Sequence, residues 1–133
     1  MPKKKPYQKK SFESTGAPND TSANLYITML MSPAWGDLTN NQRVLYTYCK
    51  AQLYAEKRKP EPDGYTGNRE NLFTMNKTKW CTLYKLYDVN NGKGFYRDMN
   101  ALIEKGFVEC VECGRFTRTK SVYAYSDKWQ EFN

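Results

Sequence analysis

The stretch that decides the fold runs from Asn76 to Tyr125 and reads NKTKWCTLYKLYDVNNGKGFYRDMNALIEKGFVECVECGRFTRTKSVYAY. Its first part predicts a short helix over roughly Thr78 to Leu86, because apolar and aromatic residues recur there at intervals of three and four. These residues are Trp80, Leu83, Tyr84 and Tyr87. We expect all four side chains to share one buried face of that helix.

A second helix is predicted from Asn91 to Lys105, after a short polar connection at 88–90. Its apolar stripe consists of Phe95, Met99, Leu102 and Ile103. The other side carries Lys93, Tyr96, Arg97 and Asn100. Gly106 then ends the helix, as glycine does when it follows the last helical residue. One side of this helix is therefore expected in the core, and the other presents cations and an amide.

Residues 107–113 and 121–125 predict the two strands of a hairpin. The turn at 114–120 contains three cations and no acid, namely Arg115, Arg118 and Lys120. A short apolar run at 72–75 predicts a third strand that joins the hairpin. Together these elements predict an α+β fold of the winged helix-turn-helix type, with three helices and a small three-stranded antiparallel sheet.

The first clear helix is expected to begin after Thr39 and to run to about Lys57. Thr39 and Gln42 make a capping-box pattern. Leu45, Tyr48, Cys49 and Leu53 share its apolar face. Residues 24–31 predict a strand or an extended segment packed across the helices. The Pro- and Gly-containing segment 57–70 predicts a long loop, either mobile or functional.

Composition divides the chain into a basic tail, 1–23, and one domain, 24–133. Five of the first ten residues are lysines, and no periodic apolar pattern follows them, so we expect disorder there. Such a tail either adds phosphate contacts or keeps the protein soluble. The whole chain of 133 residues has a net charge of +7, which favours polyanion partners. No apolar run is long enough to span a bilayer and no signal peptide is recognisable, so a cytoplasmic protein without a membrane partner is expected.

Several local strings resemble winged helix-turn-helix domains of small replication initiators and accessory DNA-binding proteins from bacterial plasmids, phages and conjugative elements. They are Ser32-Pro33-Ala34-Trp35, Leu38-Thr39, Leu45-Tyr46, Ala101 to Val108 and Ser126 to Trp129. The resemblance covers about residues 25–129. It implies a protein of the bacterial cytoplasm or nucleoid, or of the host cytoplasm if a phage encodes it.

The resemblance also implies that the second helix of the helix-turn-helix binds duplex DNA while the hairpin contacts the backbone or the minor groove. Carried over by position, the base-reading candidates are Lys93, Tyr96, Arg97 and Asn100. The phosphate candidates are Arg115, Arg118, Lys120, Lys77 and Lys79. One departure is that Gly92 and Gly94 stand where the family usually has Ser or Thr. The helix could therefore start near Phe95, which would leave Lys93 in a loop.

Catalytic and metal chemistry find little support in the sequence. The chain has no histidine, no paired-carboxylate motif and no phosphate-cradling loop, so no enzyme activity and no cofactor are expected. Cys110 and Cys113 form a CxxC spacing that suggests zinc or redox chemistry. Residues three apart on a regular strand point to opposite faces, however, so we expect these thiols to diverge. Cys49 and Cys81 are assigned to core faces of helices.

The resulting hypothesis is a sequence-specific duplex DNA-binding protein that acts in transcription regulation or in replication or transfer of a mobile element. A homodimer and other proteins of a replication or transfer complex are further partners to consider. Two other functions stay open: a protein–protein adaptor with a winged-helix fold, and a single-strand or RNA binder that stacks bases on its tyrosines.

Overall fold

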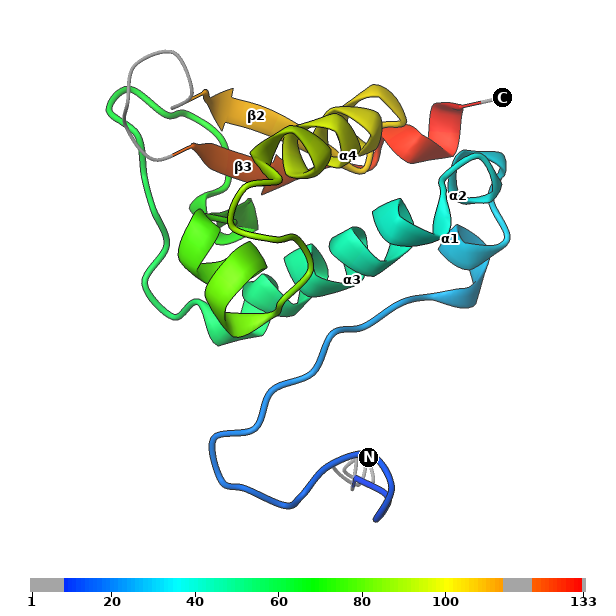
Figure 1. Cartoon of the computed structure of the whole chain (residues 1–133), viewed down its shortest axis with the longest axis vertical. Coiled ribbons are helices and arrows are strands. Elements are labelled where there is room, and N and C mark those ends of the chain that lie inside the picture. The colour runs from blue at the N-terminus through cyan, green and yellow to red at the C-terminus, as the bar shows by residue number, and fades with distance from the viewer. Residues whose placement is uncertain (1–8, 114–120, 133) are drawn as a thin grey trace, which may run out of the picture.

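The computed structural model describes residues 9–113 and 121–132, and it shows an α+β fold (Figure 1). Among these residues, one antiparallel sheet of three strands packs with helices from both ends of the domain. The helices are α1 (Ile27–Leu30), α2 (Pro33–Gly36), α3 (Asn40–Ala55), the 3-10 turn η1 (Arg69–Asn71), the π-helix η2 (Thr78–Leu83), α4 (Gly92–Glu104) and the 3-10 turn η3 (Lys128–Glu131). The strands are β1 (Leu72–Phe73), β2 (Val108–Glu112) and β3 (Val122–Tyr125).

The sheet has the strand order β1-β3-β2, so the strand from the middle of the chain pairs with the returning strand of the hairpin. Leu72 lies opposite Ala124, and Phe73 lies opposite Tyr123. The predicted three-stranded sheet is thereby confirmed. Its inner face carries Phe73 and Tyr123 into the main core, while Leu72 and Ala124 on the outer face form a smaller cluster with Tyr65 of the 57–70 loop.

Helix α3 begins where the capping box predicts. The Gln42 amide donates to Thr39 Oγ1 at 3.2 Å, and the Thr39 amide donates to Gln42 Oε1 at 2.9 Å. Leu45 and Cys49 are fully buried against α4 and the sheet, as expected for the apolar face. In Figure 1, α3 and α4 run beside each other, and the β2–β3 hairpin lies next to α4.

The segment before α3 differs from the strand or extended segment expected at 24–31, because Ile27–Leu30 and Pro33–Gly36 each form a single helical turn. Ser32 joins them: its Oγ donates to the Met29 carbonyl at 2.6 Å and accepts from the Trp35 amide at 3.2 Å. Pro33 occupies the first position of α2, where its missing N–H costs nothing. The serine cap thus outweighs the weak strand preference of a run with only two β-branched residues. Trp35 is 9% exposed and anchors this part to the core.

The predicted helix at 78–86 is wrong in type and length, since residues 78–83 form a π-helix. The Tyr84 amide donates to the Lys79 carbonyl at 2.9 Å, which is the i to i+5 pattern of a π-helix. This wider turn breaks the spacing of three and four. Trp80 stays buried at 5% exposure, whereas Leu83 is turned outward and is 62% exposed. The expectation that Leu83 lies in the core is therefore corrected.

Helix α4 starts at Gly92 rather than near Phe95, so Lys93 lies in its first turn. Asn91 caps it, with Oδ1 accepting from the Gly94 amide at 3.1 Å. At the other end, Gly106 has φ +86°, and a Cβ there would lie 2.5 Å from the Trp129 backbone nitrogen. Only glycine can adopt this left-handed backbone conformation and also leave room for the Trp129 backbone. The chain therefore turns directly from α4 into β2.

Two aromatic groups fill the core on either side of α4. Trp80 stacks on Phe95 with ring centroids 5.1 Å apart, and this contact seats the start of α4 on the π-helix. Phe107 stacks on Trp129 with ring centroids 6.1 Å apart, and this contact packs the C-terminal turn against the end of α4. Within the described part of the chain, no helix is long and apolar enough to cross a membrane.

Candidate nucleic-acid interface

Helix α4 has one face in the core and one face in solvent. Phe95, Met99 and Leu102 are at most 1% exposed, which confirms three of the four predicted core positions; the fourth, Ile103, is half-buried. Lys93, Arg97 and Asn100 are exposed, and Tyr96 is half-buried beside them. Spacings of four and three place the exposed residues on one side of the helix. The predicted outward face of α4 is therefore present.

A buried carboxylate lies directly beneath this face. Asp98 is 1% exposed and accepts three hydrogen bonds from side chains of three different segments. Tyr87 Oη donates to its Oδ2 at 2.6 Å, Gln42 Nε2 donates to Oδ1 at 3.3 Å, and Arg97 Nε donates to Oδ1 at 3.2 Å. A buried carboxylate needs such partners, because burial without them costs several kcal/mol.

The Asp98 contacts orient both neighbouring side chains. Arg97 is held through Nε, so this bond leaves its two terminal nitrogens unused. In protein–DNA complexes generally, arginine can make bidentate contacts to guanine. Burial first, and then the hydrogen bond to Asp98, raise the pKa of Tyr87 well above its ordinary value. Tyr87 therefore stays a hydrogen-bond donor even at a pH at which an ordinary tyrosine ionises. The sequence offered one signal for this arrangement, an aspartate set among the apolar positions of a helix, and our prediction missed it.

The lysines before α4 fall into two groups. Lys77 is exposed and could meet a phosphate. Lys79 is turned inward instead: its ammonium bonds to Glu56 Oε1 and, at 2.9 Å, to both the carbonyl and the hydroxyl of Thr74. Its side chain is only 16% exposed. The expectation that Lys79 contacts phosphate is therefore corrected, because Glu56 and Thr74 already occupy its ammonium.

The three predicted cations of the hairpin turn, Arg115, Arg118 and Lys120, lie outside the described residues. The chain on either side of them can be placed. Cys113 and Ser121 line a hollow of about 150 Å³ together with Tyr96 and Asn100 of α4. Cys113 and Ser121, the described residues on either side of this turn, therefore lie next to Tyr96 and Asn100 of α4.

Cys110 and Cys113 converge, contrary to the expectation that they point apart. Cys110 pairs with Tyr123 and Glu112 pairs with Val122, so β2 contains one extra residue, Val111, between these two pairs. A β-bulge of this kind shifts the alternation by one and returns positions three apart to the same side. The Cys113 and Cys110 sulfurs then lie 2.6 Å apart. Searching the described residues gave no group of three or more His, Cys, Asp or Glu arranged to hold a metal ion.

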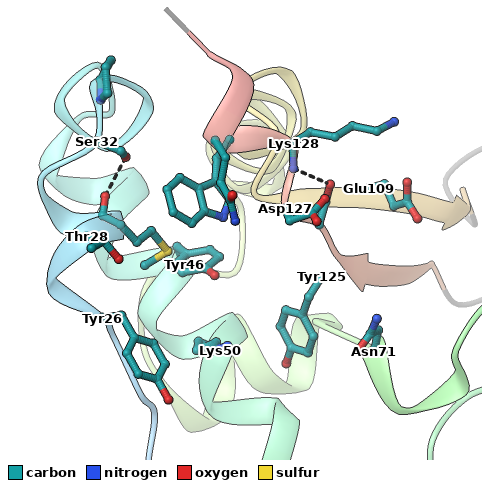
Figure 2. Close-up of a pocket in the computed structure, with 15 residues that line it drawn as sticks. Tyr26, Thr28, Ser32, Tyr46, Lys50, Asn71, Glu109, Tyr125, Asp127 and Lys128 are labelled. Carbon is teal, nitrogen blue, oxygen red and sulfur yellow. Dashed lines mark hydrogen bonds between the residues drawn. The ribbon is translucent and has the colours of Figure 1, made fainter.

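A larger hollow of about 870 Å³ lies between α1, α2, α3 and the C-terminal turn (Figure 2). None of the residues that line it belongs to α4. Its lining residues carry both signs of charge: Lys50 and Lys128 are cations, and Glu109 and Asp127 are anions. Lys50 also lies over the Tyr125 ring, 5.5 Å from its centroid. Mixed charge makes this hollow a weaker site for a polyanion than the outward face of α4.

No protein-family model, no curated protein sequence and no solved structure matches this chain.

Proposed function

We propose that this protein is a winged-helix protein that binds duplex DNA with sequence preference, through α4. The order of elements supports the proposal: α3, β1, the π-helix, α4 and then the β2–β3 hairpin, with the sheet order β1-β3-β2. In winged helices the helix before the hairpin enters the major groove, and the hairpin approaches the backbone. Transcription regulation, or replication or transfer of a mobile element, is the process we assign to it.

The observation that carries the proposal is the outward face of α4. Arg97 is exposed and suits a bidentate contact to guanine, while Asn100, three residues on, suits adenine. Lys93, in the first turn, is placed for a phosphate. A major groove about 12 Å wide accepts a helix that presents such groups on one side. The contact from Asp98 lowers the entropy lost when Arg97 docks, because one of its nitrogens is already held.

Charge supplies the rest of the affinity in this account. The net charge of +7 and the exposed Lys77 and Lys85 favour phosphate contacts around α4. Binding that rests on phosphate contacts releases counterions and weakens steeply as salt rises. We therefore expect tight binding near 50 mM salt and a large loss by 200 mM.

The experiment begins with selection of a preferred duplex from a random library, followed by fluorescence anisotropy. Arg97→Ala should lose about 1–3 kcal/mol on the selected duplex and show relaxed base preference. The matched control is Lys128→Ala, which also removes one exposed cation but from the wall of the larger hollow. Equal losses in the two variants would show that α4 does not read bases, and a library that yields no preferred duplex would contradict sequence specificity.

An adaptor function is the second candidate, and one observation favours it. Tyr26, Ile27 and Met31, in and beside α1, are 69%, 71% and 79% exposed, so apolar side chains of this region face solvent. An adaptor would show weak, sequence-blind affinity for duplex DNA in the same assay. Binding to single strands or RNA finds less support, because tyrosines such as Tyr46 and Tyr123 are buried in the core.

A further inference from the structure

Two thiols lie in contact at the end of β2, beside α4. Cys110 is half-buried and Cys113 is exposed, and both are free cysteines. Their sulfurs are 2.6 Å apart, held there by the bulge at Val111. The other two cysteines lie elsewhere: Cys49 is fully buried, and Cys81 is half-buried in the π-helix. The contact is thus confined to one pair, one member of which is open to solvent.

We propose that Cys110 and Cys113 form a reversible dithiol–disulfide site that reacts with small-molecule disulfides such as oxidised glutathione. In the first step, the Cys113 thiolate attacks one sulfur of the small molecule, forms a mixed disulfide and releases one thiolate. In the second, the Cys110 thiolate attacks the Cys113 sulfur, forms the intramolecular disulfide and expels the second thiolate. Both thiol protons pass to the released thiolates, so the dithiol is oxidised and one small-molecule disulfide is reduced to two thiols.

The order of attack follows from access. Cys113 is exposed and meets a dissolved disulfide first, whereas Cys110 is shielded by α4 and β3. Burial, and then the contact with Cys113, raise the pKa of Cys110 to about 12. Cys110 is therefore a poor first nucleophile at neutral pH, since thiolates and not thiols react. Its contact with Cys113 compensates in the second step, because a nucleophile already in place needs no diffusional encounter.

The site adjoins two residues of the proposed DNA-binding face. Cys110 and Cys113 share their 150 Å³ hollow with Tyr96 and Asn100. Glutathione is an anion, so a mixed disulfide retained on Cys113 would place negative charge beside α4 and repel DNA phosphates. Attack by Cys110 removes that adduct. This consequence rests on the proposed function, whereas the disulfide chemistry does not.

The test treats the full-length protein with oxidised glutathione, traps remaining thiols with an alkylating agent and locates the linkage by peptide mass spectrometry. The parent protein should lose two hydrogen masses and contain a Cys110–Cys113 cross-link, and a dithiol reductant should reverse it. Cys81→Ser is the matched control and should behave like the parent. Cys110→Ser should instead accumulate a stable glutathione adduct on Cys113. The proposal is overturned if the parent accumulates the same adduct to the same extent, or if Cys113 pairs mainly between two molecules.

A second readout separates this chemistry from DNA binding. The Cys110→Ser adduct should bind the selected duplex at least about threefold more weakly than the reduced variant at low salt, because the adduct adds repulsion. The oxidised parent, which carries no adduct, should differ from the reduced parent by less. If no form binds duplex DNA, the proposed function fails while the mass measurement still decides the disulfide. If the adduct forms and leaves the affinity unchanged, the link to α4 is refuted.

Discussion

Replacing Asp98 with asparagine should destabilise the protein and loosen Arg97 while keeping the shape of the side chain. The carboxylate is 1% exposed and accepts from Tyr87, Gln42 and Arg97 at 2.6, 3.3 and 3.2 Å. An amide retains one oxygen, which can serve the two donors now on Oδ1. Its NH₂ group then faces the Tyr87 hydroxyl, so that short bond is reversed or lost.

The magnitude follows from the strength of the bonds affected. Hydrogen bonds to a charged acceptor contribute about 1.5–3 kcal/mol each, against about 1 kcal/mol for neutral pairs. Losing the charge and weakening the Tyr87 bond should therefore lower the free energy of unfolding by about 2–3 kcal/mol. Asp98→Ala should cost about 3–5 kcal/mol, since it removes all three bonds to the carboxylate and leaves the half-buried Gln42 and Tyr87 donors without this acceptor.

Urea unfolding followed by tryptophan fluorescence measures this change. Tyr87→Phe is the matched comparison, because it removes one of the three bonds and keeps the charge, and it should fall between the parent and Asp98→Ala. Asp98→Asn should also weaken binding to the selected duplex, but less than Arg97→Ala does, because the Arg97 guanidinium remains and is only held less firmly. Surface substitutions usually change the free energy of unfolding by less than about 0.5 kcal/mol. If Asp98→Asn differs from the parent by no more than this, the hydrogen bonds to Asp98 do not stabilise the fold.

Three further changes test other parts of the structure. Lys79→Met should lower the free energy of unfolding in urea by about 2–3 kcal/mol. This loss is smaller than for a fully buried pair, because the side chains of Lys79 and Glu56 are 16% and 14% exposed. Lys77→Met, at an exposed position, should lower it by less than about 0.5 kcal/mol. Gly106→Ala should lower the free energy of unfolding by at least about 3 kcal/mol in the same assay. An alanine is strained at φ +86°, and its Cβ would also clash with the Trp129 backbone. A loss near 1 kcal/mol would contradict this packing. Burial raises the pKa of Tyr46 to about 12, above the value near 10 expected in the unfolded chain. The protonated Tyr46 therefore contributes fully to the free energy of unfolding below pH 10, and this contribution is lost as the pH rises toward 12. The free energy of unfolding should be measured from pH 9 to 11.5 for the parent and for Tyr46→Phe. Above pH 10, the parent should lose about 1.4 kcal/mol more per pH unit than the variant. Parallel curves for the two proteins would refute the assignment to Tyr46.

The elements with strong local signals could be predicted from the sequence. Thr39 and Gln42 specify the start of α3 through contacts three residues apart, and Gly106 specifies the end of α4 through its own backbone. The apolar stripe from Phe95 to Leu102 likewise needs only helical geometry. These features depend on near neighbours, so periodicity and capping rules identified them.

Features that depend on distant contacts or on irregular backbone were missed. Leu83 lies outside the core because the π-helix changes the spacing that the prediction assumed. The bond from Gln42 to Asp98 joins residues 56 apart, and no local rule connects them. The bulge at Val111 is a single inserted residue, and it alone reverses the expected direction of Cys113 relative to Cys110. The sign and exposure of the α4 face were predictable, and so was an unusual aspartate at position 98, but its partner Gln42 from α3 was not.

The central claim is that the outward face of α4 meets duplex DNA, and NMR titration of the labelled protein with its selected duplex tests it most directly. The backbone amides of residues 93–100 and the Arg97 Nε–H signal should shift most, while those of Lys50 and Lys128 around the larger hollow should stay nearly unchanged. Shifts centred on that hollow, with α4 unaffected, would contradict the claim.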